Sequence, residues 1–254
     1  MVACAFIFVA GVLSEDVRAE TVPVVAAAAS LRYTLDDIAT AFEQETGQRV
    51  RLTYGATRSV MHQIENGAPY ELFLAADTES VQRLAGKGRT EGPPYVFAHG
   101  RVALVAPTES SVSVDGTLTG LARALGSGEV DHVAIANPEV APYGRAAQEA
   151  LQKAGLWHNL SSYLVRGENV GQAAQFATTG AAQAGLIAYS LALAPEVAPL
   201  VAVALIPEDW HQPINHSMGL LRGAGTTARA FAAFLKSEQA RVILERDGFS
   251  APPL

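Results

Sequence analysis

Small polar residues mark four turns at which a helical pattern begins. Ser30 and Thr57 each follow a strand pattern, Asn137 leads to the turn that contains Tyr143, and Asn169 directly precedes Val170. The first turn of a helix carries N–H groups without intrahelical acceptors, at the positive end of the helix dipole. Ordinary helix capping is the simpler explanation of any one turn. If several converge, however, they form an anion site that needs no lysine or arginine.

Arg58 is the charged residue closest in sequence to these turns. If the chain forms two lobes with a ligand cleft between them, the guanidinium group of Arg58 either points into that cleft, as a fork for an oxyanion, or lies on the helix surface. On the surface it pairs with Glu65 or with a carboxylate across the lobes. We favour the outward direction, but a side chain at a helix start can take either one. An inward Arg58 would favour a ligand different from that of a neutral-donor site.

Patterns typical of enzymes and metal proteins are missing from the sequence. It contains no G-x-S-x-G elbow, no G-x-x-x-x-G-K-[ST] loop and no G-x-G-x-x-G fingerprint. Its six histidines form no H-E-x-x-H or H-x-H pair. Cys4 is the one cysteine, which excludes a disulfide framework, a thiolate zinc site and a cysteine-ligated iron–sulfur cluster. We therefore expect no catalytic residues, no cofactor and no metal cation.

Length and composition indicate a folded chain that does not bind nucleic acid. The 254 residues are 49% hydrophobic and 17% charged, which excludes intrinsic disorder. A formal net charge of −7 argues against a nucleic-acid partner, because such a partner requires a basic surface. The eleven apolar residues 3–13 are too short to span a bilayer as a helix and suit a signal peptide, or else a buried strand. We expect export to the periplasm and cleavage after Ala19.

The rest of the chain alternates between strand and helix patterns. Expected strands are residues 22–28, 50–54, 71–76, 101–106, 133–136, 163–165, 185–188, 200–206 and 217–221. Such alternation predicts mostly parallel sheets with helices on both faces, and the number of strands indicates two α/β lobes. The expected organisation is a signal peptide at 1–19, a discontinuous lobe 1 at 20–102 and 216–254, and lobe 2 at 103–215. A ligand would then lie in the cleft between the lobes, beyond the carboxyl ends of the strands.

Four ordered motifs resemble the periplasmic molybdate-binding proteins of ABC transporters, which are type II solute-binding proteins. They are VAAAASL at 25–31, QIENGAPYELFLAAD at 63–77, ANPEVAPYG at 136–144 and GLIAY at 185–189. Residues 228–249 are also similar to the closing helices of that family, so that the resemblance covers residues 22–249. Glu71 stands where the family usually has aspartate, and Thr57 where it has a second serine.

This resemblance implies a two-lobed periplasmic-binding-protein fold that holds one tetrahedral oxyanion between its lobes. The implied donors are the hydroxyl groups of Ser30, Thr57 and Tyr189 and the backbone N–H groups of Tyr143 and Val170. The implied function is capture of molybdate or tungstate by a monomer and its delivery to an inner-membrane ABC permease. Rival hypotheses are a binding protein for a different anion or small organic acid that uses Arg58, a ligand-sensing subunit for a membrane receptor, and an exported enzyme with an unfamiliar site.

Overall fold

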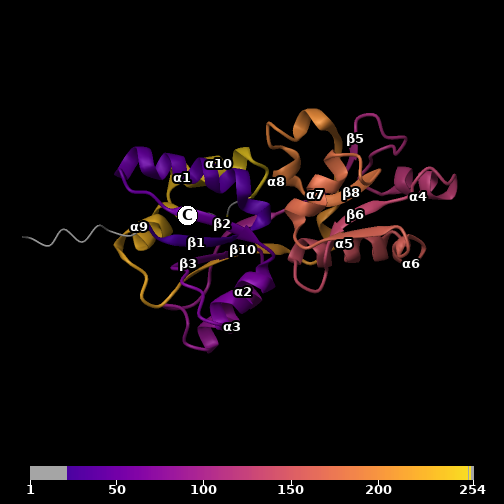
Figure 1. Cartoon of the computed structure of the whole chain (residues 1–254). Helices are drawn as coiled ribbons and strands as arrows, with labels where there is room; N and C mark the ends of the chain where they lie inside the picture. Colours follow the sequence, from indigo (N-terminus) through magenta and orange to yellow (C-terminus); the bar gives the residue numbers. More distant parts are fainter. Residues whose placement is uncertain (1–21, 251, 253–254) are drawn as a thin grey trace, which may run out of the picture.

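The protein folds into two α/β lobes, each built on a five-stranded sheet (Figure 1). The computed structural model describes residues 22–250 and residue 252. The expected signal peptide at residues 1–19 lies outside this part. Within it, no helix is long and apolar enough to cross a membrane. The two-lobed fold expected from the sequence is confirmed.

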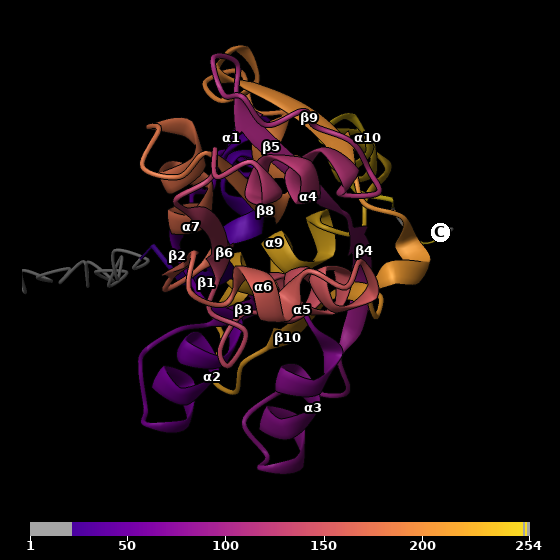
Figure 2. The same ribbon diagram turned by 90° about the vertical axis from the view of Figure 1, so that its right-hand side faces the viewer.

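The first lobe contains the sheet β2-β1-β3-β10-β4. Its strands are β1 (Val24–Ala28), β2 (Arg51–Gly55), β3 (Leu72–Ala75), β4 (Tyr95–Gly100) and β10 (Ile214–Leu220). Its helices are η1 (Ala29–Leu31), α1 (Arg32–Thr46), α2 (Thr57–Glu65), α3 (Thr78–Gly86), α9 (Thr226–Phe234) and α10 (Glu238–Arg246). β10 is antiparallel to both of its neighbours, so the other four strands share one direction. Figure 2 shows α2 and α3 together on one side of this sheet.

The second lobe repeats this topology in the sheet β7-β6-β8-β5-β9. Its strands are β5 (Val102–Pro107), β6 (Val133–Ala136), β7 (Leu164–Gly167), β8 (Ala184–Ala188) and β9 (Val201–Leu205). Its helices are α4 (Thr119–Gly126), α5 (Pro142–Lys153), α6 (Trp157–Leu160), α7 (Val170–Thr178), α8 (Tyr189–Ala192), η2 (Ala198–Leu200) and η3 (Glu208–Trp210). Here β5 is the reversed strand. The lobes therefore share an arrangement of strands although the sequence shows no clear repeat.

The chain passes between the lobes twice. It leaves the first lobe at Arg101, between β4 and β5, and returns through residues 206–213, between β9 and β10. Val102 therefore belongs to the second sheet and Ile214 to the first. The boundaries expected from the sequence, 102/103 and 215/216, remain a prediction. The yellow helices α9 and α10 in Figure 1 then pack on the first lobe.

Helix α1 illustrates how the sequence dictates packing in the first lobe. Leu35, Ile38 and Phe42 recur at helical spacing and are buried. The helix ends at Gly47, whose φ of 70° lies in the left-handed region that glycine adopts readily. Phe42 meets the ring of Phe231 edge-on, with the centroids 5.2 Å apart. This contact fixes the C-terminal helix α9 against the N-terminal part of the chain.

Candidate functional site

A small cavity lies between the lobes, at the carboxyl ends of the strands. Its twelve lining residues are Ala28, Ala29, Ser30, Gly55, Ala56, Thr57, Ala76, Ala141, Pro142, Tyr143, Asn169 and Val170. Four of the five donors expected from the sequence are among them, two from each lobe. None of these twelve residues is charged. The volume of about 10 Å³ is close to the space of one water molecule, so a carbon chain does not fit between the lobes as they lie here.

Ser30 lies in η1, directly after β1, and is only 1% exposed. Its Oγ is 3.0 Å from Nε2 of His216, which belongs to β10 of the same lobe. Its carbonyl oxygen accepts a hydrogen bond of 2.8 Å from Oγ of Ser190 in the second lobe. Ser30 is therefore fixed from both lobes at the edge of the cavity.

Thr57 is the first residue of α2 and is also 1% exposed. Its Oγ1 accepts a 3.0 Å hydrogen bond from the backbone N–H of Ala76, which follows β3. This bond uses the oxygen of Thr57 as an acceptor and leaves its hydroxyl proton available to a ligand. Threonine in place of the family's serine thus keeps the donor.

Tyr143 and Val170 lie in the first turns of α5 and α7, and they line the cavity from the second lobe. Neither backbone N–H has a hydrogen-bond acceptor among residues 22–250. At α7, the Asn169 side chain caps the helix by accepting from the N–H of Gln172. Two helix N-termini therefore present unpaired donors and positive dipole ends to the same small space.

The phenol of Tyr143 is an unusual group beside this cavity. Its hydroxyl has no hydrogen-bond partner in the described structure. Burial raises the pKa of Tyr143, and the nearby Ser30 side chain lowers it by a smaller amount, although their geometry is not that of a hydrogen bond. Tyr143 is therefore protonated at neutral pH and brings no negative charge to the site.

Tyr189, the fifth expected donor, does not line the cavity. It opens α8 directly after β8, and its backbone N–H bonds to the carbonyl of Arg101. Its ring lies against the backbone of Gly248, so close that a Cβ on Gly248 would be 2.6 Å from Cδ1 of the tyrosine. The structure therefore brings Ser30, Thr57, Tyr143 and Val170 together around the cavity, whereas Tyr189 is not among the residues that line it.

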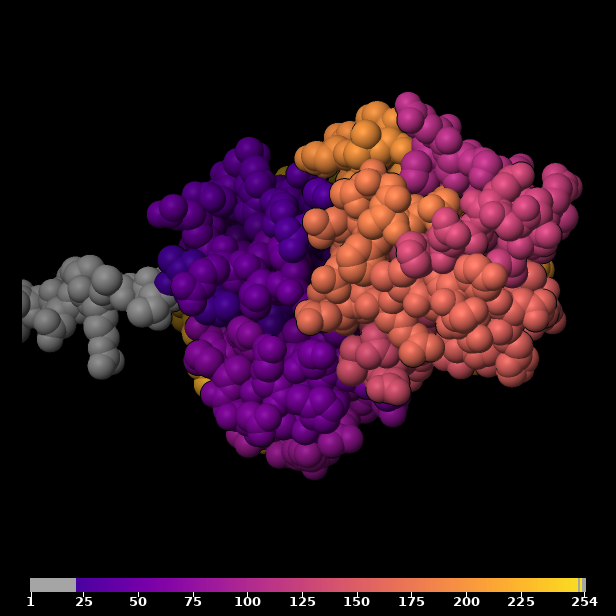
Figure 3. Space-filling view, turned by 45° about the vertical axis from the view of Figure 1, so that its right-hand side comes forward, coloured from indigo at the N-terminus to yellow at the C-terminus, as the bar shows by residue number. Residues whose placement is uncertain are grey.

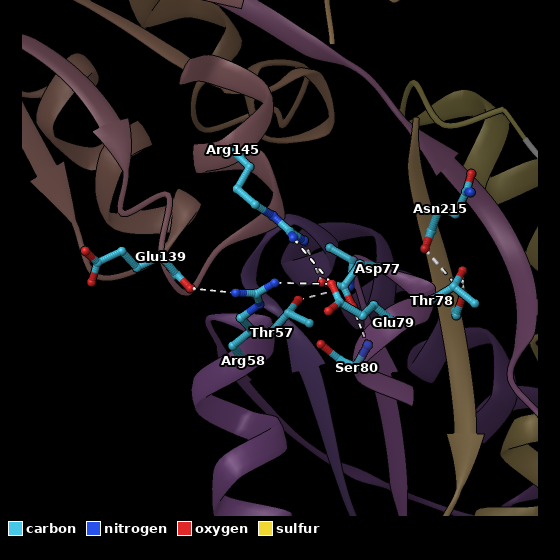
Figure 4. Close-up of polar contacts among 11 residues, drawn as sticks. Thr57, Arg58, Asp77, Thr78, Glu79, Ser80, Glu139, Arg145 and Asn215 are labelled. Atoms are coloured by element: carbon cyan, nitrogen blue, oxygen red, sulfur yellow. Dashed lines mark hydrogen bonds and ion pairs between the residues drawn. The ribbon is translucent and has the colours of Figure 1, made fainter. Parts of the chain in front are cut away.

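Arg58 also lies outside the cavity, in a polar cluster that joins the lobes (Figure 4). Its Nη2 is 3.2 Å from Oε2 of Glu79, and its Nη1 donates to the carbonyl of Glu139 at 3.3 Å. From the second lobe, Arg145 reaches Asp77 at 2.9 Å and Glu79 at 3.5 Å. We call these five residues the clasp. Glu65, the other partner considered for Arg58, instead binds Arg83, Lys87 and His62.

The lobes are in contact in this structure, as Figure 3 shows in the space-filling view. The backbone N–H of Arg58 donates to the carbonyl of Val140 at 3.1 Å, across the interface. Together with the clasp and the Ser190–Ser30 hydrogen bond, this contact gives a closed arrangement. A ligand enclosed here would be shielded from bulk water.

Sequence reasoning missed two residues of the site region. Asn169 lines the cavity, and the signal for it was its position one residue before Val170. His216 lies behind Ser30 and is fully buried. No local pattern pointed to His216, because its partner is 186 residues away in the sequence.

Comparisons with known proteins show which proteins this chain is similar to. Residues 23–250 match the family model described as bacterial extracellular solute-binding protein. The molybdate-binding protein ModA of Azotobacter vinelandii is 33% identical over 243 residues, which cover 94% of each chain. The ModA protein of Escherichia coli K12 is 33% identical over 228 residues, which cover 88% of this chain and 87% of that one.

A solved structure shows the same fold. The periplasmic molybdate-binding protein of Azotobacter vinelandii superimposes with a TM-score of 0.82 at 28% identity, over 91% of this chain and 100% of that one. The family model and the relatives above each cover most of the chain. The chain therefore belongs to the bacterial extracellular solute-binding protein family, whose members are transport proteins and not enzymes.

Proposed function

We propose that this protein captures molybdate or tungstate outside the cytoplasm and delivers it to an ABC permease. The observation that carries the proposal is the cavity itself, in which four neutral donors from two lobes surround a space without a charged side chain. Similarity to relatives named molybdate-binding proteins supports the choice of ligand. The name of the solved Azotobacter vinelandii protein, which calls it periplasmic, supports a periplasmic location. The permease partner and the monomeric state are part of the proposal.

The chemistry of the site fits a small dianion. A buried anion needs hydrogen bonds to its lone pairs, and bonds to a charged acceptor are short and strong. The hydroxyls of Ser30 and Thr57 and the N–H groups of Tyr143 and Val170 supply such donors. Because each donor is fixed by its own helix or strand end, the cage has a set radius. A smaller ion such as sulfate would lengthen each bond and bind less tightly.

Thermal unfolding in the presence of single oxyanions tests this function. Molybdate and tungstate should each raise the melting temperature, with a stabilisation of about 2.7 kcal/mol at a hundredfold excess over the dissociation constant. Sulfate and phosphate should give little or no shift at the same concentration. Absence of any shift or binding heat with molybdate and tungstate would contradict the proposal.

The variant Arg58→Ala separates this function from an organic-acid clamp. Its side chain lies in the clasp and outside the cavity, so we expect molybdate affinity to change by no more than a few fold. A clamp that needs the guanidinium group would lose binding altogether. Titration calorimetry of the variant against molybdate distinguishes the two results.

A further inference from the structure

His216 is a buried polar residue directly behind the cavity. It belongs to β10 and is fully buried, and its Nε2 lies 3.0 Å from Oγ of Ser30. It does not line the cavity and so cannot itself touch a ligand there. Any role of His216 in binding must therefore act through Ser30.

The surrounding residues hold the His216 ring in one place. Phe249 packs edge-on at a centroid distance of 5.1 Å, and Tyr143 lies at 5.9 Å. The pairing of β10 with β4 shifts by one residue between His216 and Ser217, so that Phe97 is skipped. Bulges of this kind re-aim side chains beside functional sites. The bulge therefore lies directly beside His216, whose Nε2 contacts Oγ of Ser30.

Gly100 provides the space that this arrangement requires. A Cβ at this position would lie 2.8 Å from Cε1 of His216 and 2.1 Å from the hydroxyl oxygen of Tyr143. Both distances are shorter than van der Waals contact allows. The absence of a side chain at Gly100 therefore lets both rings approach the back of the cavity.

Counting protons determines which way the hydrogen bond between Ser30 and His216 runs. A neutral imidazole carries one ring proton, and Nδ1 of His216 makes no hydrogen bond within the described structure. A proton on Nδ1 would therefore be a buried donor without an acceptor, which is costly and rare. The proton is better placed on Nε2, where it can donate to Oγ of Ser30.

The charge state of His216 is consistent with this count. Burial, as the main cause, and His99 together lower the pKa of His216 from 6.5 to about 3, and the nearby Ile214 backbone raises it by a smaller amount. The ring is therefore neutral at the pH of ordinary growth. A neutral ring with its proton on Nε2 occupies a lone pair of Ser30 and leaves the serine proton free.

We propose that His216 is a positioning residue for the anion site: its Nε2–H donates to Oγ of Ser30 and so directs the Ser30 hydroxyl proton toward the bound oxyanion. The proposal rests on the function proposed above. With the opposite tautomer, Ser30 would donate its one proton to His216 and would offer the anion only oxygen lone pairs. His216 thereby sets whether Ser30 attracts or repels the ligand.

Three substitutions at His216 separate this role from simple packing. His216→Phe retains an aromatic ring among Phe249, Phe97 and Tyr143 but removes the donor. In His216→Gln the side-chain amide reaches the position of Nε2 and can donate to Ser30. His216→Asn is the matched control, because its shorter amide overlies Nδ1 and cannot reach Ser30. Each variant is titrated with molybdate by calorimetry, and its melting temperature is measured without ligand.

We expect His216→Phe to lower molybdate affinity by up to about tenfold, because the Ser30 hydroxyl loses the donor that directs its proton toward the anion. His216→Gln should recover most of that loss, and His216→Asn should not. In a Ser30→Ala background, His216→Phe should cost no further affinity, because the bond it supports is already gone. Equal affinity of His216→Phe and the unchanged protein would overturn the proposal. Failure of the unchanged protein to bind molybdate would instead contradict the proposed function.

A spectroscopic measurement keeps the proposal testable even if a variant fails to fold. Long-range ¹H–¹⁵N correlation spectra of the unchanged, ¹⁵N-labelled protein identify which ring nitrogen of His216 carries the proton. The proposal requires the Nε2–H tautomer both without ligand and with molybdate bound. A proton on Nδ1 in the molybdate complex would overturn it.

Discussion

At the scale of single residues, this site offers an anion neutral hydrogen-bond donors in place of positive charges. Thr57 shows how one side chain serves two purposes. Its oxygen accepts from the N–H of Ala76, at the end of β3, while its proton remains available to the cavity. A threonine hydroxyl can do both at once because it has one proton and two lone pairs. The same hydroxyl group thus stabilises the lobe and, in the proposed site, donates to the ligand.

The substitution Thr57→Val should therefore affect both properties. It leaves the buried N–H of Ala76 without an acceptor, which should lower the free energy of unfolding by about 1–3 kcal/mol. It also removes one donor to the ligand, so molybdate affinity should fall about tenfold. Thr57→Ser is the control, because serine keeps the hydroxyl. Chemical denaturation and calorimetry of both variants check the prediction, which is wrong if Val and Ser behave alike.

The depressed pKa of His216 predicts a pH dependence of stability. Burial lowers this pKa to about 3 in the folded state, against 6.5 in the unfolded chain. As the pH falls, His216 binds a proton in the unfolded chain at a higher pH than in the folded protein. The free energy of unfolding therefore decreases between about pH 6.5 and pH 3. Between pH 7 and pH 5 the loss due to His216 should be about 2 kcal/mol. Urea denaturation at the two pH values should show a smaller loss for His216→Phe than for the unchanged protein.

At the scale of helices and strands, close contact between elements brings the backbone donors to the cavity. Gly144 lies in the first turn of α5, next to Tyr143, and a Cβ there would be 2.4 Å from the carbonyl oxygen of Ala136 at the end of β6. The helix can start against the end of its strand only because this residue has no side chain. The position of the Tyr143 N–H depends on that contact.

We predict that Gly144→Ala displaces the start of α5. The overpacking should cost about 1–3 kcal/mol of stability, and the shifted N–H of Tyr143 should weaken molybdate binding. Gly126→Ala, at the end of α4, is the matched control because no atom lies within 4 Å of its Cβ position. It should be neutral or slightly stabilising, as alanine favours a helix over glycine. Thermal melts with and without molybdate compare the two variants.

Most elements followed from local patterns, and the exceptions are informative. The periodicity of Leu35, Ile38 and Phe42 predicted α1. The apolar run before Ser30 predicted β1, and the alternating pattern of residues 50–54 predicted β2. The strand β4 was missed. Its burial runs from exposed Tyr95 through half-buried Val96 to a buried pair, then half-buried His99 and buried Gly100, so it lacks both a continuous apolar run and a clean alternation. Its place in the sheet is determined by pairing with β10, more than 100 residues later.

At the scale of the whole molecule, the clasp stabilises the closed arrangement. Arg145 of the second lobe pairs with Asp77 and Glu79 of the first, and Asp77 simultaneously caps α3 by accepting from the N–H of Ser80 (Figure 4). The Asp77 side chain is 13% exposed, so its pair with Arg145 is partly shielded from solvent. Opening the lobes must break these ion pairs, which therefore favour retention of a bound ligand.

We predict that Arg145→Gln accelerates release of molybdate by about two- to fivefold, in line with the modest strength of partly exposed ion pairs. Association should change less, since the open state lacks the pair. Arg241→Gln is the control, because its ion pairs with Glu238 and Glu245 lie within α10. Stopped-flow fluorescence at low and at high salt measures the rates. If Arg145→Gln and Arg241→Gln release the ligand equally fast, the clasp has no role in closure.

Within the candidate site, the sequence predicted only residues that stand where a strand pattern gives way to a helix pattern. Ser30, Thr57, Tyr143 and Val170 each start a helix after an extended segment, and all four line the cavity. His216 and the ion pair between Arg145 and Asp77 join segments far apart in the chain, and nothing in their neighbouring sequence indicates a partner. The position of Tyr189, against Gly248, likewise depends on how the C-terminal segment packs on the second lobe.

The position of β10 also imposes an order of assembly. This strand lies between β3 and β4, so the first sheet is incomplete until residues 214–220 are available. The second sheet uses only β5 to β9 and can pair as soon as that continuous segment exists. The lobe that begins the chain is thus the last to be completed. A chain that stops before residue 214 would leave β4 without its partner and β3 with an open edge, which exposes strands prone to aggregation.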